Sequence, residues 1–319
     1  MPSRPHPSAR SAGPLSRRGA RTSAAALVVL TLLLSALAAC SSGVDIGVEG
    51  VDARWIDVDG PGDRRALLVT GDAGDESNST AADGSALPLV VVLHGLGQDA
   101  EHMATIGGWA QLAADGRAVV VFPDGHDHSW DAGTCCGEAS ADRVDDVAYL
   151  DRLIDQVVGS TGADGDAVHM VGFSNGGMMT YRYLCEGKVR LRGAASIAGT
   201  DVDGCTPSRP TTFIQISGSA DTIVPLYDTP SAAPELGPLE PVSSSVRGVA
   251  AAFDCPNPRL GRTGPVTQTV WTPCAEGVTV RFDVVAGMPH AYPIVDGYQG
   301  TDQILQLWGL APAEGASGP

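Results

Sequence analysis

Residues 167–184 read AVHMVGFSNGGMMTYRYL, and this stretch decides the fold. The apolar run 167–171 is typical of a buried strand, and 177–184 has the periodicity of a helix. Between them, residues 172–176 form a G-x-S-x-G motif, in which the glycines permit a sharp turn that lifts the serine hydroxyl clear of the sheet. The motif also arises by chance as an ordinary turn, but the strand and helix around it favour Ser174 as a nucleophile.

A serine nucleophile needs a general base, and the base needs an orienting carboxylate. Where this motif sits between a strand and a helix, the chain order is serine, acid, histidine. His290 is the one histidine after Ser174, and it lies in a Gly/Pro-rich loop behind the strand-like run 278–285. We therefore expect His290 to be the base; the alternative is a surface histidine without a chemical role.

The orienting acid is less tightly constrained by the sequence. Asp221 follows a short turn behind the apolar run 212–217. An aspartate just past the carboxyl end of a strand fits a site built at one edge of a sheet, so Asp221 is the first choice. Asp201 and Asp203, which follow the run 194–198, are the alternatives. The remaining acidic candidates in this part of the chain are Asp228, Glu235 and Glu240.

The oxygen that becomes negative when serine attacks a carbonyl needs N–H donors. One donor is expected to be the backbone N–H of Asn175, the residue after the nucleophile. The other is expected from the loop behind the buried strand 89–93, where we favour the N–H of Leu96. His94 precedes Ser174 in the chain, so we interpret it as a histidine that holds this loop by hydrogen bonds.

Strand-like and helix-like runs alternate along the chain. This alternation predicts an α/β fold with a mostly parallel central sheet covered by helices on both faces. The first two strands are expected to pair antiparallel, and the length fits a single domain over 51–310. The expected strands are 51–58, 65–70, 89–93, 118–122, 167–171, 193–198, 212–217, 266–271 and 278–285; the expected helices are 100–114, 143–158, 176–187, 243–254 and 301–309.

An ordered set of short motifs spans residues 88–294: VLHG at 92–95, FPDG at 122–125, Trp130 with CCG at 135–137, VDDV at 144–147, GFSNGGM at 172–178, GSADTIVP at 218–225 and HAYP at 290–293. The set resembles the esterases that group poly(3-hydroxybutyrate) depolymerases with feruloyl and acetylxylan esterases. That resemblance implies an α/β-hydrolase fold and ester hydrolysis without a metal or other cofactor. It also implies Ser174, Asp221 and His290 as the catalytic triad. Two departures concern substrate preference: Met288-Pro289 replaces small residues, and Tyr292 replaces a tryptophan.

The N-terminus has the pattern of an export signal over 1–39. Residues 1–22 carry five arginines and no acidic residue, and 24–39 is a run of small and apolar residues. That run is shorter than the roughly 20 residues of a membrane-spanning helix. It ends in Leu-Ala-Ala-Cys, which resembles a bacterial lipoprotein processing box with the lipid on Cys40. A plain secretory signal is the alternative. We expect a tether over 40–50 and a flexible tail over 311–319.

The charge balance bears on possible partners. Removal of residues 1–39 would change the formal net charge from −17 to −22, because five arginines and no acids would leave. Such a chain repels nucleic acids and anionic membrane surfaces, so we expect no nucleic-acid partner, and membrane contact only through a lipid on Cys40. A monomer is expected.

Six cysteines remain besides Cys40, and an exported chain can form disulfides. Cys255 and Cys274 flank one segment and are the best pair, and Cys185 and Cys205 bracket one strand and could also pair. The adjacent Cys135 and Cys136 are expected to bond to different partners. A zinc site is the rival interpretation, but no Cys-x-x-Cys spacing favours it.

Together these features predict an exported, lipid-anchored serine esterase. Expected substrates are feruloyl or acetyl esters on polysaccharide, short-chain acyl esters, or hydroxyalkanoate oligomers. Trp130 and Tyr292 are candidates for substrate contact, although Trp130 could equally serve packing. Two rival functions stay open: a serine peptidase of the same fold, and a non-catalytic cell-surface lipoprotein that binds a glycan.

Overall fold

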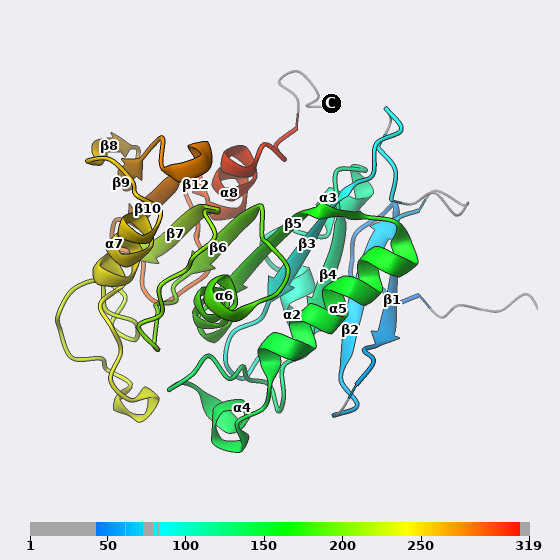
Figure 1. Ribbon diagram of the computed structural model, residues 1–319, viewed down its shortest axis with the longest axis horizontal. Coiled ribbons are helices and arrows are strands. Elements are labelled where there is room, and N and C mark those ends of the chain that lie inside the picture. The colour runs from blue at the N-terminus through cyan, green and yellow to red at the C-terminus, as the bar shows by residue number, and fades with distance from the viewer. Residues whose placement is uncertain (1–42, 61, 73–78, 82, 313–319) are drawn as a thin grey trace, which may run out of the picture. The chain divides into compact units, whose positions relative to one another are not determined.

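A ten-stranded sheet forms the centre of the protein (Figure 1). The computed structural model describes residues 43–60, 62–72, 79–81 and 83–312. The strand order is β1-β2-β4-β3-β5-β6-β7-β10-β9-β8, in which the six strands from β4 to β10 run parallel and the flanking pairs run antiparallel. The strands are β1 Val51–Asp57, β2 Arg65–Gly71, β3 Pro88–Leu93, β4 Val119–Pro123, β5 Asp164–Phe173, β6 Gly193–Ile197, β7 Thr212–Gly218, β8 Arg259–Thr263, β9 Val266–Trp271 and β10 Val280–Val285, with a hairpin of β11 Ile294–Val295 and β12 Tyr298–Gln299.

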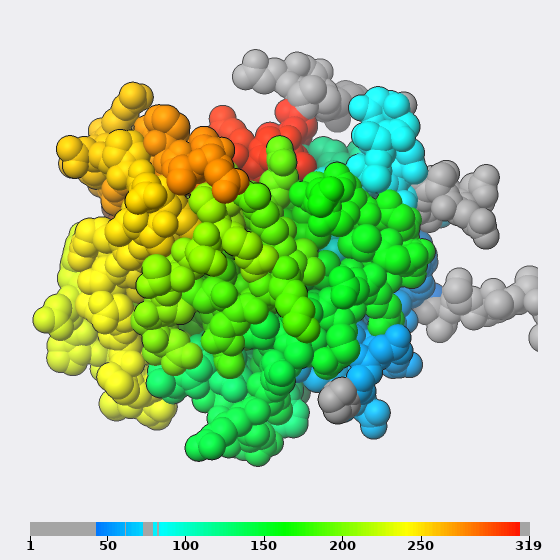
Figure 2. Space-filling model, in the orientation of Figure 1, coloured from blue at the N-terminus to red at the C-terminus, as the bar shows by residue number. Residues whose placement is uncertain are grey.

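Helices cover both faces of the sheet. The side chains of α5, α6 and α7 join the core on one face, and those of α2, α3 and α8 join the core on the other. Figure 2 shows the first of these faces, with the green surface of α5 and α6 beside the yellow segment that contains α7. The helices are α2 Ala100–Thr105, α3 Gln111–Ala114, α4 Gly137–Asp142, α5 Asp146–Thr161, α6 Asn175–Glu186, α7 Val242–Ala252 and α8 Gly300–Trp308.

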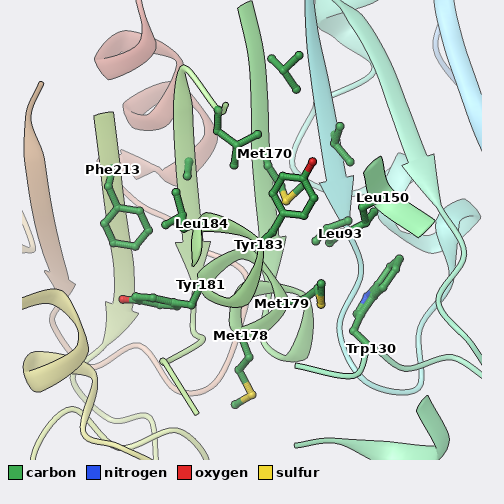
Figure 3. Close-up of a cluster of buried hydrophobic side chains, with 14 of the residues drawn as sticks. Leu93, Trp130, Leu150, Met170, Met178, Met179, Tyr181, Tyr183, Leu184 and Phe213 are labelled. Atoms are coloured by element: carbon green, nitrogen blue, oxygen red, sulfur yellow. The ribbon is translucent and has the colours of Figure 1, made fainter. Parts of the chain in front are cut away.

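The alternation within β3 explains why this strand lies at the centre. Leu89, Val91 and Leu93 pack toward α5 and α6, whereas Val90 and Val92 pack toward the opposite face. All five side chains are fully buried, and each contributes roughly 1.5–3 kcal/mol relative to exposure. Figure 3 shows the first core, in which aromatic and sulfur-containing side chains of α6 meet the strands. The predicted parallel sheet with helices on both faces is therefore confirmed.

Several element boundaries differ from those expected. The helix expected over 100–114 is split in two, because Gly107 and Gly108 adopt φ values of 73° and 70° between α2 and α3. The helix expected over 143–158 begins only at Asp146, where the Asp145 side chain accepts a hydrogen bond from the N–H of Ala148. Strand β8 was not expected, because all its side chains are exposed and give no burial pattern.

The tether expected over 40–50 is wrong for the part that the structure describes. The Val44 N–H donates to Ala53 O at 2.7 Å, and Ile46 is buried against the domain. The chain therefore packs on the domain from about this point onward. The export signal over 1–39 and Cys40 lie outside the described residues, as does most of the tail expected over 311–319. None of the described helices is long and apolar enough to cross a membrane.

Candidate active site

Ser174 occupies a sharp turn between β5 and α6. Its backbone has φ 53° and ψ −116°, a conformation that a non-glycine residue adopts only when its surroundings impose it. A side chain at Gly172 would bring its Cβ within 2.0 Å of the Gly176 carbonyl oxygen, and one at Gly176 would meet the His94 carbonyl oxygen at 2.5 Å. Only glycine fits at either position, so the motif produces the turn that places Ser174 beyond the end of the strand.

Ser174, His290 and Asp221 form one hydrogen-bonded chain. The Ser174 hydroxyl lies 2.9 Å from His290 Nε2, and His290 Nδ1 lies 2.8 Å from Asp221 Oδ2. The three residues follow the carboxyl ends of β5, β10 and β7, which meet at the same edge of the sheet. The histidine can therefore accept the serine proton on one ring nitrogen while it donates to the carboxylate from the other.

Asp221 is itself fixed by its own loop. Its carboxylate is buried, and Oδ1 accepts hydrogen bonds from the N–H groups of Ile223 and Val224 at 2.9 Å each. Only Oδ2 remains for the imidazole. The alternative acid Asp201 instead accepts from the N–H groups of Asp203 and Gly204, both at 3.1 Å, and closes a turn of its own. Burial raises the pKa of Asp201.

The two expected oxyanion donors both have backbone N–H groups available. Asn175 is the first residue of α6, so its N–H has no acceptor within the helix. The N–H of Leu96 donates to no acceptor in the part of the chain that the structure describes. The loop around Leu96 is held by Gly95 N–H, which donates to Gln98 Oε1, and by Gly97 N–H, which donates to His128 O.

His94 holds the loop between β3 and α2 from inside the protein. Its ring is buried, and Nε2 accepts from the N–H of Gly125 at 2.8 Å, so Nδ1 carries the hydrogen donated to Gly95 O. Burial lowers the pKa of His94 to about 4, which keeps the ring neutral at neutral pH. The structure thus gives His94 the loop-holding contacts expected from the sequence.

Trp130 is a packing residue, which corrects its assignment to substrate contact. Its side chain is fully buried and appears in Figure 3 among the core side chains beside α6. Its indole N–H donates to His94 O at 2.9 Å. Because large aromatic side chains bury more area than other residues, the buried indole of Trp130 contributes strongly to the stability of this core.

The side chain of Asn175 joins Trp130 to the turn at Ser174, a contact that was not predicted from the sequence. Its Oδ1 accepts from the N–H of Trp130 at 2.7 Å, and its Nδ2 donates to the carbonyl of the same residue at 3.0 Å. Both groups are buried. The sequence offered one indication of this contact. Asn175 stands at the start of a buried helix, and a buried side-chain amide needs hydrogen-bond partners.

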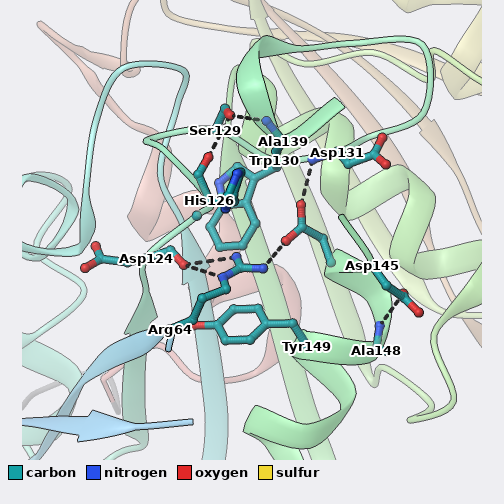
Figure 4. Close-up of polar contacts among 12 residues, drawn as sticks. Arg64, Asp124, His126, Ser129, Trp130, Asp131, Ala139, Asp145, Ala148 and Tyr149 are labelled. Atoms are coloured by element: carbon teal, nitrogen blue, oxygen red, sulfur yellow. Dashed lines mark hydrogen bonds and ion pairs between the residues drawn. The ribbon is translucent and has the colours of Figure 1, made fainter. Parts of the chain in front are cut away.

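A second buried polar group, the carboxylate of Asp146, holds the segment around Trp130, which lies between β4 and α5. Asp146, fully buried, pairs with the guanidinium of Arg64 and accepts from the N–H of Asp131 at 2.6 Å. Arg64 also donates to Asp124 O, and its guanidinium lies 3.5 Å from the ring centre of Tyr149 (Figure 4). Burial raises the pKa of Asp146, and the Arg64 charge opposes that rise.

Tyr292 contributes to the site mainly through packing. Its hydroxyl accepts from Trp109 Nε1 at 2.6 Å and contacts Thr301 Oγ1 at 3.1 Å, so this polar group is occupied inside the protein. The ring centre of Phe173 lies 6.0 Å from that of Tyr292 and 5.6 Å from that of His290. Phe173, the second residue of the motif, is therefore the aromatic side chain that lies against the histidine.

Three disulfides join the six cysteines that the structure describes. Cys255–Cys274 and Cys185–Cys205 pair as anticipated. The expectation that Cys135 and Cys136 bond to different partners is wrong, because the two are bonded to each other. With the other four described cysteines already paired, each of these two has only its neighbour available. Among the residues described, no group of three or more His, Cys, Asp or Glu side chains could hold a metal ion.

The parallel sheet with helices on both faces and the sharp serine turn behind β5 are those of the α/β-hydrolase fold. An acetyl xylan esterase from Aspergillus awamori has a similar structure, with a TM-score of 0.56 at 15% sequence identity over 82% of this chain and 99% of that one. At this level of identity the likeness concerns the fold.

Relatives in sequence carry esterase names. Putative esterase NocK of Nocardia uniformis subsp. tsuyamanensis is 31% identical over 51% of this chain and 50% of its own length. The bifunctional acetylxylan esterase/xylanase XynS20E of Neocallimastix patriciarum is 25% identical over 73% of this chain and 32% of its own. Feruloyl esterase C of Emericella nidulans is 30% identical over 36% and 40%.

The chain thus spans half or less of the length of these curated relatives. No protein-family model matches it.

Proposed function

We propose that the protein is a serine esterase that hydrolyses carboxylic esters through Ser174, His290 and Asp221. The observation that carries this proposal is the hydrogen-bonded chain of these three side chains, with distances of 2.9 and 2.8 Å, at a strained serine turn. The esterase names of the relatives agree with it.

In this mechanism His290 Nε2 takes the hydroxyl proton as Ser174 Oγ attacks the ester carbonyl. The N–H groups of Asn175 and Leu96 stabilise the oxyanion, and each such donor contributes about 2.7–4 kcal/mol in other serine hydrolases. His290 then passes its proton to the leaving alcohol, which gives an acyl-enzyme on Ser174. Water activated by the same nitrogen releases the acid and restores the serine, while Asp221 stabilises the imidazolium.

The substrate class follows from the relatives and from the site's chemistry. The names of the relatives point to acetyl groups on xylan and to feruloyl esters, and the sequence motifs add hydroxyalkanoate oligomers. Phe173, half-buried beside His290, offers an apolar surface to the acyl group or to the leaving alcohol. We therefore expect small or planar acyl groups on a larger alcohol.

The rival functions are less well supported. A serine peptidase would use the same triad, but the relatives named here are esterases. A non-catalytic binding protein would have no need for the hydrogen bonds that align Ser174, His290 and Asp221.

The direct test is a panel of substrates: p-nitrophenyl acetate, acetylated xylan, methyl ferulate, a hydroxybutyrate oligomer, and an amide analogue of the ferulate. The proposal predicts turnover of at least one ester and none of the amide, with Ser174→Ala as the blank. Turnover of the amide at the ester rate would favour a peptidase. Absence of turnover on every ester, p-nitrophenyl acetate included, would favour the binding protein.

We also propose that the protein is exported and held at the cell surface by a lipid on Cys40. Disulfides persist in oxidising compartments, and the three described here fit export. Stable anchoring requires more than one acyl chain, which a lipoprotein cysteine carries. Cys40→Ser should move the protein from the membrane fraction to the soluble fraction; wild-type protein free in the medium would contradict the lipid anchor.

A further inference from the structure

A hollow of about 800 Å³ lies at the edge of the sheet opposite the catalytic triad. The residues that line it lie at the amino-terminal ends of β5, β6 and β7, in the segment before β10, and at the carboxyl-terminal end of α8. Figure 1 shows where these elements lie in the fold. Asp166 lies near the start of β5, and Ser174 follows the end of the same strand. At about 3.3 Å per residue of extended strand, the two are roughly 26 Å apart. The hollow is therefore separate from the site of ester hydrolysis.

The lining of the hollow is rich in planar polar groups and has no net charge. Two carboxylates and two guanidinium groups offset each other, and burial lowers the pKa of the adjoining His169 to about 4, so its ring is neutral at neutral pH. Arg190 pairs with Glu276, whereas Arg192 has no ion-pair partner in the described part of the chain. The planar polar side chains are those of Asp166, Arg190, Arg192, Glu276 and Gln306.

One indole ring, that of Trp308, adjoins these groups. It is half-buried, and its position is fixed by the ring of His169, whose centre lies 4.8 Å away. A Cβ at Gly193 would come within 2.5 Å of the indole nitrogen, so glycine is required for the ring to lie there. The buried N–H of Trp308 has no acceptor among the described residues, although buried indole N–H groups usually find one.

We propose that this hollow binds a neutral oligosaccharide, as a second site distinct from the catalytic one. Sugar hydroxyls both donate and accept hydrogen bonds, so they match a mixed set of carboxylate, guanidinium and amide groups. The exposed part of the indole matches the apolar C–H face of a sugar ring. An anionic ligand would need an excess of positive charge, and an apolar ligand would leave the charged groups without partners. The volume suits a short stretch of sugar units.

Such a site would hold the enzyme on a polysaccharide surface while the opposite edge of the sheet acts on ester groups. The inference goes beyond the proposed esterase function and does not depend on it, because an unesterified sugar chain would bind equally well.

The test is isothermal titration of the mature chain (residues 40–319, after removal of the expected export signal) with xylohexaose and with cellohexaose, two neutral sugars without ester groups. We expect at least one of them to bind. Arg192→Ala and Gln306→Ala should each weaken that binding roughly tenfold, the effect of losing one hydrogen bond to a charged or polar partner. Both residues are exposed, so both variants should fold. Their turnover of p-nitrophenyl acetate should equal that of the wild type.

Arg262→Ala is the matched control, because Arg262 is an exposed arginine of β8 outside the hollow, and it should bind the sugar normally. Failure of both sugars to bind at millimolar concentration would overturn the proposal. So would binding that survives in Arg192→Ala and Gln306→Ala, or binding that Arg262→Ala weakens equally. Tighter binding of a sulfated oligosaccharide than of either neutral sugar would show an anion site instead. Loss of esterase activity would leave these outcomes unaffected.

Discussion

The turn at Ser174 and the loop between β4 and α5 (residues 124–145) are joined by the Asn175 side chain, but they are built differently. The turn depends on Gly172 and Gly176, which lie within two residues of the serine. The loop depends on distant partners, because Arg64 directly precedes β2 and Asn175 is the first residue of α6. We conclude that the position of the nucleophile is set by a short local motif, whereas the conformation of the loop is set by polar contacts with residues remote in the chain. Substitutions in the two regions should therefore affect different properties of the protein, turnover for the turn and stability for the loop.

The largest expected effect is on the turn. Ser174→Ala should lower kcat on p-nitrophenyl acetate by about 10⁶-fold, because no other group supplies the attacking oxygen. The unfolding midpoint in urea should stay close to that of the wild type, since the serine hydroxyl is not part of the core. A variant that loses stability together with activity would show that the turn also supports the fold.

Asp221→Asn should follow, with a fall in kcat of about 10⁴-fold, because the amide favours the wrong tautomer of His290. Asp201→Asn is the matched control and should keep wild-type activity, since its side chain only closes a turn. If Asp201→Asn is the impaired variant and Asp221→Asn is not, the orienting acid has been misassigned.

Substitutions that disturb the loop should lower the free energy of unfolding of the protein. Arg64→Met should destabilise the protein by about 3–5 kcal/mol, because it leaves the buried carboxylate of Asp146 without its partner. Arg65→Ala, at the next position, should cost at most about 1 kcal/mol, because its ion pair with Asp124 is exposed to solvent. Urea unfolding measures the stability of both variants. Equal losses of unfolding free energy would show that the buried arginine contributes no more than the exposed one.

The pH dependence of stability tests the histidine that lies between the two regions. Burial lowers the pKa of His94 from 6.5 to about 4. Between pH 6.5 and pH 4 the unfolded chain therefore binds a proton on His94 that the folded chain does not. Stability should therefore fall as the pH drops from about 6.5 to about 4, by up to about 1.4 kcal/mol per pH unit for this group.

Urea unfolding across this range should show a shallower pH dependence for His94→Gln than for the wild type. His102→Gln, which changes an exposed histidine, should leave the slope unchanged. An unchanged slope in His94→Gln would mean that His94 titrates in the folded protein as it does in the unfolded chain.

The smallest predicted effect concerns the contact that joins the regions. Asn175→Ala removes both hydrogen bonds to Trp130 and should lower kcat by about 10²-fold with little change in KM, because the oxyanion donors lose their alignment. Asn257→Ala, at an exposed asparagine, should have no effect. A rise in KM without a fall in kcat would instead indicate that the side chain contacts the substrate.

The same contrast explains what could be predicted from the sequence. The strand, turn and helix around Ser174 and the positions of His290 and Asp221 follow from local patterns, because each residue sits at a strand end that its own neighbours define. The roles of Arg64, Asp146 and the Asn175 side chain could not be predicted, because their partners are remote in the chain. For Trp130 the sequence left substrate contact and packing equally open, because nothing near it in the chain reveals that the side chain is buried.

The covalent intermediate gives the most direct test of the central claim. The mature protein is treated with a serine-directed organophosphonate until p-nitrophenyl acetate turnover stops, and its peptides are analysed by mass spectrometry. We predict one phosphonyl group per chain, on Ser174, with inactivation proportional to labelling and no label on Ser174→Ala. Complete inactivation with the label on another residue, or full labelling of Ser174 with turnover unchanged, would contradict the assignment of Ser174 as the nucleophile.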